Sequence, residues 1–153
     1  DVFDLVYSWG VIHHSPNTQT AVDEIFRVLK PGGCAKIMIY HKWSVVGFML
    51  WLRYGLFSLK PLTTMTEIYG KYLESPGTKA YSIKEGHELF SNYINVQIST
   101  ILTHGDLLTS GAGQRHEGVA LSIARRLWPR VFIRRFFKNS GLFMLINAKK
   151  TKN

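Results

Sequence analysis

The sequence predicts an α/β fold that contains one parallel βαβ crossover. Three observations lead to this prediction: a short apolar run at residues 3–7, a second apolar run at residues 35–40, and an amphipathic helical pattern between them. The chain has 153 residues, of which 46% are hydrophobic, and this suits a single globular domain. A parallel connection of this kind is right-handed in nearly all proteins.

The first strand is predicted at residues 3–7, where the sequence is Phe-Asp-Leu-Val-Tyr. A mostly apolar run of this length is typical of a strand buried on both faces of a parallel sheet. A polar loop with Gly10 follows, and then the helix begins. Ser15 would be a good N-cap with Pro16 at the first helical position, and Thr18 is the alternative cap.

The predicted helix has one apolar face and ends at a Pro-Gly-Gly turn at residues 31–33. The second strand then covers residues 35–40. It is preceded by Cys34, which is the only cysteine and therefore excludes an internal disulfide and a cysteine-rich zinc site. We expect this thiol to be buried and inert. The apolar face of the helix carries Ala21, Ile25, Val28 and Leu29.

The most apolar segment is residues 43–59, which has about the minimum length of a membrane span, roughly 17 residues. Arg53 lies inside it, and a charge at that depth is costly in a bilayer. We expect a packed helix that covers a pocket, with a membrane-surface helix and a transmembrane helix as alternatives. Residues 60–80 are rich in proline and hydroxyl side chains, so the whole of 42–80 is predicted to be an inserted apolar cap.

Regular structure is predicted to resume at residues 82–85, which match the Ser-x-x-Glu capping box of a helix that runs to about residue 91. Residues 94–102 alternate between apolar and polar, as a strand with one buried face does. A glycine-containing loop at 105–118 and a helix at 119–128, ended by Pro129, come before a final strand at 142–148. The predicted organisation is a βαβ core at 1–41, the cap at 42–80, a helix and edge strands at 81–148, and a basic tail at 149–153.

The chain is basic, with 19 Lys and Arg against 10 Asp and Glu and a net charge of +9. This balance favours an anionic partner, which could be a phosphorylated metabolite, an acidic membrane surface or nucleic acid. A solvated basic face over a core stripe is the default interpretation of residues 125–138. Docking to acidic lipid headgroups and RNA binding are the alternatives, although no recognised RNA-binding motif is present. The cationic residues are Arg125, Arg126, Arg130, Arg134, Arg135 and Lys138, and they alternate with aromatic and aliphatic residues.

Three short motifs occur in a specific order: Asp-Leu-Val at 4–6, Val-Ile-His-His at 11–14 and Arg-Val-Leu-Lys-Pro-Gly-Gly at 27–33. Together they resemble the second half of the sheet in class I S-adenosylmethionine-dependent methyltransferases, and more narrowly the small-molecule branch with the ubiquinone and menaquinone enzymes. The resemblance covers residues 3–41, and beyond them only the topology is similar. It implies a Rossmann-like sheet with an antiparallel edge, S-adenosyl-L-methionine as cofactor and a small-molecule acceptor.

The family's Gly-rich loop and the acidic residue that holds the ribose have no counterpart in this sequence. The Gly111-x-Gly113 pair follows no buried strand and opens no early helix, so it does not replace that loop. The chain also begins at Asp1, without a Met and already within the first strand. We therefore expect a C-terminal portion of a longer protein, one that binds the cofactor weakly or not at all by itself.

The resemblance assigns Ser8, Trp9 and Gly10 to the loop that passes the methionine end of the cofactor. Trp9 offers a flat apolar wall, or alternatively packs under the inserted helix. His13 and His14 are candidate catalytic bases, since a neutral imidazole can take a proton from the acceptor. Either histidine could instead cap the following helix or bind a loop carbonyl.

On the family's layout, Tyr40 and His41 close the second strand and face the acceptor pocket, although Tyr40 could equally be a core residue. The apolar segment 43–59 suggests a hydrophobic acceptor such as a lipid or a prenylated ring, or is simply a structural lid. No metal site is expected, because the other histidines show no ligand spacing on a shared helical face. These histidines are His41, His87, His104 and His116.

The sequence thus predicts methyl transfer from S-adenosylmethionine to a small, hydrophobic or biosynthetic acceptor. A non-catalytic module that sits on membranes through its basic and aromatic surface is the first alternative, and an RNA methyltransferase is the second. The expected location is cytoplasmic, with peripheral contact with an anionic membrane as a further prediction.

Overall fold

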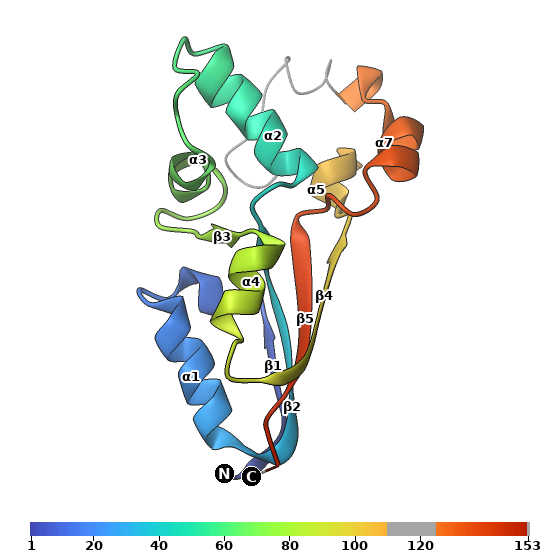
Figure 1. Ribbon diagram of the computed structural model, residues 1–153. Coiled ribbons are helices and arrows are strands. Elements are labelled where there is room, and N and C mark those ends of the chain that lie inside the picture. Colours follow the sequence, from blue (N-terminus) through green and yellow to red (C-terminus); the bar gives the residue numbers. More distant parts are fainter. Residues whose placement is uncertain (110–124, 153) are drawn as a thin grey trace.

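A five-stranded mixed sheet forms the centre of the computed structural model, which describes residues 1–109 and 125–152 (Figure 1). The strands follow the order β1-β2-β5-β4, with β3 paired to the end of β2. β1 and β2 are parallel, and β5 is antiparallel to both of its neighbours. The strands are β1 (Phe3–Trp9), β2 (Leu29–His41), β3 (Ala80–Tyr81), β4 (Ile94–Ile101) and β5 (Phe143–Lys149).

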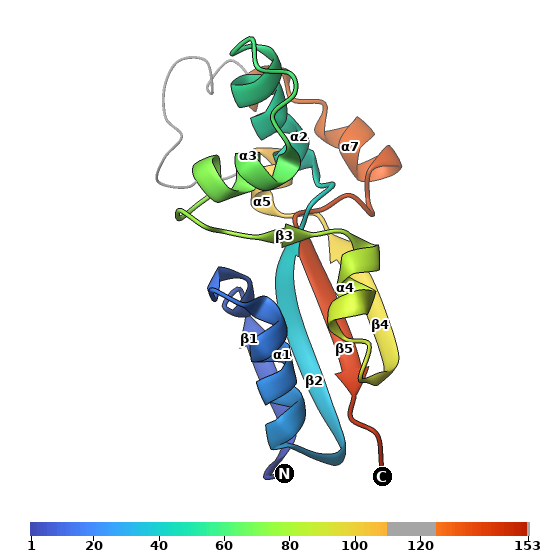
Figure 2. The ribbon, with the colours of Figure 1, turned by 60° about the vertical axis from the view of Figure 1, so that its left-hand side comes forward.

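Helices cover one face of the sheet and the end at which β1 and β2 finish (Figures 1 and 2). α1 and α4 lie on the face, whereas α2, η2 and α3 form a cap at the end. The predicted parallel βαβ unit with antiparallel edge strands and a helical cap is confirmed. The helices are η1 (Ile12–His14), α1 (Thr18–Val28), α2 (Val45–Trp51), the π-helix η2 (Leu52–Leu56), α3 (Met65–Tyr72), α4 (Ile83–Leu89), α5 (His104–Leu107) and α7 (Arg130–Phe136).

The crossover helix α1 begins with a cap that differs from both predicted ones. The side chain of Asn17 accepts a hydrogen bond from the Thr20 backbone N–H at 3.3 Å. Ser15 instead donates its hydroxyl to the carbonyl of Ile12 at 2.7 Å, which closes the short helix η1. The predicted caps Ser15 and Thr18 are therefore wrong, because η1 uses the first and the chain turns helical only at the second.

β2 begins six residues earlier than predicted, so the Pro-Gly-Gly segment at 31–33 lies inside the strand and not in a turn. Gly32 has a φ of 78°, which a residue with a side chain rarely adopts, and its N–H donates to the Lys150 carbonyl at 3.2 Å. The register with β1 shifts between Phe3 and Leu5, so the strand accommodates the irregularity as a bulge. Cys34, predicted to be buried, is only half-buried.

The main core lies between the sheet and the helices α1 and α4. Val22, at 1% exposure, is more deeply buried than the predicted face residues Ala21 and Ile25. The capping box of α4 forms as predicted between Ser82 and Glu85, and the burial of β4 alternates. The most buried apolar side chains of this core are Val22, Leu29, Ala35, Ile39, Phe90, Met144 and Ile146.

The opposite face of β1 carries large apolar side chains that are exposed. The prediction of a strand buried on both faces is wrong for this chain, since no helix among the described residues covers this side of β1 (Figure 2). Within the part of the chain that the structure describes, β1 is also an edge strand, paired with β2 alone. The exposed fractions are 51% for Phe3, 52% for Leu5, 62% for Tyr7 and 45% for Trp9.

Within the cap, the apolar segment 43–59 does not form one continuous helix. Ser44 caps α2 by accepting a hydrogen bond from the Gly47 N–H at 3.0 Å, and the helix changes to π geometry after Trp51. Among the described residues, no helix combines the length and the apolar character that crossing a bilayer requires. α2 packs on Ile68 and Tyr69 in a second buried cluster.

Asp106 joins the cap to the sheet and was not identified from the sequence. Its side chain is fully buried, and its carboxylate accepts the Val46 N–H at 3.1 Å and the Leu142 N–H at 2.9 Å. It also accepts the Thr103 N–H at 2.8 Å. One carboxylate thus satisfies backbone donors from α2, from the start of α5 and from the approach to β5.

The C-terminal third differs most from the prediction. The loop predicted at 105–118 contains α5, and its remainder, with Gly111-x-Gly113, lies largely outside the described residues. Of the helix predicted at 119–128, residues 125–128 are described, and of these 125–127 are helical. A helix that the sequence did not predict, α7, follows Pro129. The predicted basic tail is partly wrong, since Lys150 is buried and its ammonium donates to the Leu29 carbonyl at 2.7 Å.

The prediction of a core stripe under the basic residues of 125–138 is wrong. On α7 only Ile133 is buried, at 5% exposure, whereas Val131 is 82% and Phe136 is 68% exposed. The reason is that α7 packs at the cap end of the molecule and not on the sheet (Figure 1).

Candidate functional site

The predicted site residues lie near the ends of β1 and β2, next to the cap. Trp9 is the last residue of β1 and is paired with Met38, two residues before Tyr40 in β2. The loop after β1 brings η1, with His13 and His14, against the same strand end. In open α/β sheets, the carboxyl ends of the strands are the usual place for ligands.

The last residue of β1 presents an exposed aromatic side chain next to a glycine turn. The ring of Trp9 is stacked on Tyr7 at a centroid distance of 6.1 Å and meets the Phe143 ring edge-on at 5.7 Å. Trp9 therefore rests on β1 and β5, and not under the cap helix. Gly10 has a φ of 69°, and its N–H donates to the Met38 carbonyl at 3.1 Å. The half-buried Ser8 precedes this turn.

His13 is fully buried between two other rings. Its centroid lies 4.2 Å from that of His14 and 4.3 Å from that of Tyr40. Neither ring nitrogen has a hydrogen-bond partner among the described residues. Burial, with smaller contributions from the charges of His14 and Lys79, lowers the pKa of His13 to about 3. The side chain is therefore neutral near pH 7 and a weak base.

His14 is the accessible member of the pair, with 31% of its side chain exposed. Its Nδ1 lies 3.3 Å from the hydroxyl oxygens of both Ser75 and Thr78. Its Nε2 lies 3.9 Å from a carboxylate oxygen of Glu74. Neither histidine caps α1. These polar contacts of His14 all come from the loop after α3.

Glu74 also contacts Tyr40, so one carboxylate is shared by two site residues. The Tyr40 hydroxyl donates to Glu74, and burial together with this carboxylate raises the pKa of Tyr40 well above its usual range. Tyr40 therefore keeps its proton at neutral pH. His14, Glu74 and Tyr40 are called the cap cluster below. Glu74 was not identified from the sequence, because it lies about sixty residues from His14, in a segment predicted only to be a loop-rich insertion.

Lys79 connects the cap to the loop of η1. Its backbone N–H donates to the His13 carbonyl at 3.3 Å, and its ammonium donates to the carbonyls of Ser15 and Pro16. The side chain is thus engaged with backbone oxygens beside the cap cluster. This contact fixes the position of the two histidines relative to the end of β2.

His41 lies apart from the cap cluster. It is 5% exposed, and its carbonyl accepts the Tyr69 hydroxyl at 2.9 Å. Burial lowers the pKa of its imidazole, which contacts the Gly141 backbone. None of the described contacts joins this ring to His14 or Glu74. Within residues 1–109 and 125–152, no group of three or more His, Cys, Asp or Glu side chains is arranged to hold a metal ion.

Comparison with known proteins gives matches in both sequence and structure. Residues 1–37 match a family model described as a methyltransferase domain. No curated protein matches the chain. Solved structures of similar fold include an S-adenosylmethionine-dependent methyltransferase from Thermotoga maritima, described as a possible histamine N-methyltransferase. It is 16% identical and has a TM-score of 0.57 over 97% of this chain and 56% of its own.

Two further structures support the same fold. The Haemonchus contortus phosphoethanolamine N-methyltransferase 2, solved with S-adenosyl-L-methionine, is 16% identical, with a TM-score of 0.55 over 97% of this chain and 33% of its own. An Archaeoglobus fulgidus S-adenosylmethionine-dependent methyltransferase is 13% identical, with a TM-score of 0.50 over 97% of this chain and 60% of its own. The chain thus spans between a third and three fifths of the length of these structures. Over that part, it has the α/β fold of S-adenosylmethionine-dependent methyltransferases.

Proposed function

We propose that the protein takes part in methyl transfer from S-adenosyl-L-methionine to a small acceptor. The observation that carries the proposal is the loop after β1, where exposed Trp9 adjoins Gly10 with its positive φ. This loop lies within the matched segment 1–37 and at the ligand-binding end of the strands. The similar folds of known methyltransferases support it.

Ser8, Trp9 and Gly10 would hold the methionine end of the cofactor. Gly10 has no side chain over its Cα, so the backbone can approach a ligand closely, and the Trp9 ring offers an apolar wall. The cofactor supplies a methyl group on a sulfonium, which an acceptor atom attacks in line. The Gly-rich loop and the ribose-binding acid are absent from this sequence, so these residues account for only part of a binding site.

His14 is the better of the two candidate bases, because it is accessible whereas His13 is enclosed and weakly basic. As the acceptor oxygen or nitrogen forms its bond to the methyl carbon and the carbon–sulfur bond breaks, the acceptor proton passes to the His14 imidazole. The Glu74 carboxylate stabilises the resulting imidazolium. His13 acts as a positioning residue that holds the rings of His14 and Tyr40.

The acceptor would bind beneath the cap, against Tyr40. The protonated Tyr40 hydroxyl and the Glu74 carboxylate offer it polar contacts, and the segment 42–80 encloses the strand end with apolar side chains. His41 supports this wall through its backbone contact with Tyr69. A hydrophobic or biosynthetic acceptor and the ubiquinone and menaquinone branch remain the narrower predictions.

Calorimetric titration with S-adenosylmethionine tests the proposal. The chain of 153 residues is expected to bind weakly or not at all, and a form extended upstream to supply a Gly-rich loop should bind and transfer methyl groups. In the extended form, exchange of Trp9→Ala should weaken cofactor binding. Tight binding by residues 1–153 alone would refute the account of the missing parts, and failure of both forms to bind would refute the proposed activity.

A second candidate function, attachment to an anionic membrane surface, is favoured by a separate observation. α7 exposes Phe132 and Phe136 next to Arg134 and Arg135, a combination typical of helices that lie in the headgroup region. Such attachment is weakened by salt, because charges on a surface are screened. It would not require catalysis, and it could also bring the protein to a lipid-soluble acceptor.

A further inference from the structure

A second exposed apolar element lies at the same end of the molecule as α7. The loop 57–62, which follows η2, is called the apical loop here, and its large side chains project from the surface. Phe57 is 77% exposed, Leu59 is 90% and Leu62 is 93%. Both the apical loop and α7 lie at the cap end, opposite the two termini (Figures 1 and 2).

The apical loop is a defined turn and not a frayed end. The Lys60 N–H donates to the Gly55 carbonyl at 2.8 Å, and the Leu59 N–H donates to the Leu56 carbonyl at 3.1 Å. Leu59 has a φ of 56°, a conformation that a leucine rarely adopts. The turn therefore holds its apolar side chains outward in a fixed arrangement. The positive φ of Leu59 costs conformational free energy, and packing within the chain does not explain that cost.

The charged residues within these two segments are all of one sign. Residues 43–62 contain Arg53 and Lys60 but no Asp or Glu, and residues 125–152 likewise contain no acidic residue. Arg130 is bound to the carbonyls of Leu107 and Leu108, so it anchors α7. The exposed cations around α7 are Arg126, Arg134, Arg135 and Lys138.

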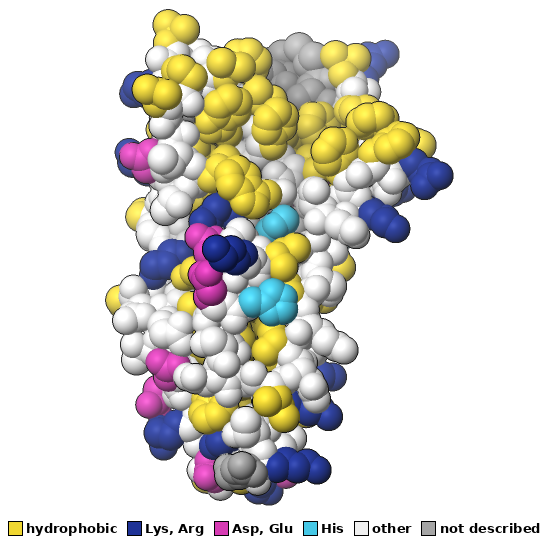
Figure 3. Space-filling model, in the orientation of Figure 1, with side chains coloured by type: hydrophobic (Ala, Val, Ile, Leu, Met, Phe, Trp, Pro, Cys, Tyr) yellow, Lys and Arg dark blue, Asp and Glu magenta, His cyan; other side chains and the backbone are white. Residues whose placement is uncertain are grey.

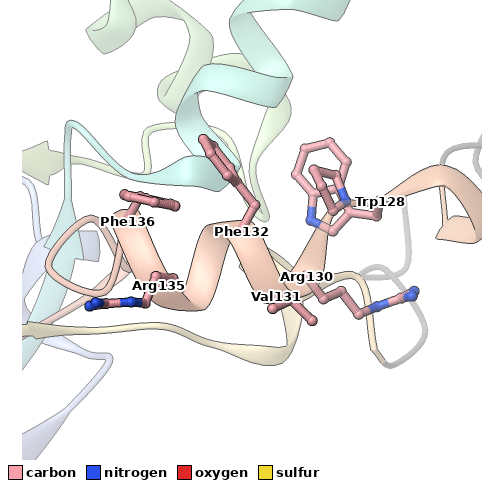
Figure 4. Close-up of a pocket in the computed structure, with 7 residues that line it drawn as sticks. Trp128, Arg130, Val131, Phe132, Arg135 and Phe136 are labelled. Atoms are coloured by element: carbon pink, nitrogen blue, oxygen red, sulfur yellow. The ribbon is translucent and has the colours of Figure 1, made fainter.

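The aromatic side chains of α7 form one row. Trp128, Phe132 and Phe136 point to the side of the helix that faces α2, and Arg135 lies beside Phe136 (Figure 4). They line an open apolar hollow, and the rings of Phe132 and Phe136 are 4.7 Å apart. Figure 3 shows hydrophobic side chains gathered over α2 and over α7 at this end, with cations at the margin of the α7 patch.

We propose that the apical loop and α7 together dock the cap end onto a lipid bilayer with anionic headgroups. Phe57, Leu59 and Leu62 insert at the interface, and Arg134 and Arg135 contact the phosphates. The absence of acidic residues from both segments gives charge complementarity to an anionic surface. The protruding apolar side chains favour a bilayer over a protein surface or RNA. The proposal rests on the second candidate function and is independent of methyl transfer.

Co-sedimentation with vesicles of phosphatidylcholine, with and without 30% phosphatidylserine, tests the docking. The protein should bind anionic vesicles at least tenfold more tightly than neutral ones at low salt. The double variant Arg134→Gln/Arg135→Gln should lower that affinity about tenfold, since each basic residue near the surface adds attraction. The matched control Lys36→Gln/Lys149→Gln removes two exposed charges from the sheet and should change the affinity less than twofold.

Insertion of the apical loop has its own readout. In a Cys34→Ser background, an environment-sensitive dye on Leu59→Cys should brighten and shift to the blue with anionic vesicles, and the same dye on Lys84→Cys should not. The variant Phe57→Ser/Leu59→Ser should weaken binding at both low and high salt, because apolar contacts are not screened. Circular dichroism establishes that each variant is folded.

The outcomes distinguish insertion of the apical loop from attachment through α7. If the arginine variant loses binding but the dye on residue 59 is unchanged and the loop variant binds normally, loop insertion is refuted and attachment through α7 stands. If the protein ignores anionic vesicles at low salt, both are refuted. Binding of a structureless RNA but not of vesicles would also overturn the proposal and favour the RNA alternative.

Discussion

Acidification should destabilise the protein through His13. The pKa of this imidazole is about 3 in the folded chain, against an ordinary value of 6.5. Below pH 6.5 the unfolded chain therefore binds a proton that the folded chain does not, and stability falls as the pH falls. At pH 5, which is 1.5 pH units below the ordinary pKa of 6.5, the free energy of unfolding falls by about 2 kcal/mol. The loss approaches about 5 kcal/mol only near pH 3.

The exchange His13→Phe isolates this effect, because a phenyl ring can occupy the space between His14 and Tyr40 and has no proton to bind. Urea unfolding at pH 7.5 and pH 5 should show that the wild type loses about 2 kcal/mol more than the variant. His41, whose pKa burial also lowers, acts in the same direction in both proteins and cancels in the difference. The exposed His87→Gln serves as control and should behave as the wild type. Equal pH dependence in the wild type and His13→Phe would refute the assignment of a neutral buried imidazole.

Three further predictions concern the site and the frame that holds it. His14→Asn, in a form that is active in methyl transfer, should lower turnover about a hundredfold with cofactor affinity little changed, and turnover within a few-fold of wild type would make the residue structural. Asp106→Asn should lower the free energy of unfolding by about 2 kcal/mol, because the NH2 group of the amide cannot accept a hydrogen bond from a buried backbone N–H. The exposed control Asp23→Asn should lower it by less than about 0.5 kcal/mol. Phe90→Ala should lower the free energy of unfolding, measured in urea, by about 3 to 5 kcal/mol, since the ring is fully buried between α4 and the sheet. A smaller loss would mean that this core collapses around the cavity.

Local patterns in the sequence determined the order and type of most elements. The βαβ crossover, the capping box at Ser82 and the alternation of β4 each depend on residues within a few positions of one another. Capping and burial periodicity act over one or two turns, so they are visible without a fold. The motif of residues 4–33 likewise indicated the ligand-binding end of the sheet before any contact was known.

Tertiary structure alone decided which of these residues can act together. The contact of His14 with Glu74, the three-way role of Asp106 and the exposure of α7 each depend on segments far apart in the chain. His13 and His14 are equivalent as neighbours in the sequence, yet one is enclosed by Tyr40 and the other is open. Burial, pKa and access to a ligand are properties of the surroundings in space, and sequence distance does not record which surfaces the packed elements bring together or leave uncovered.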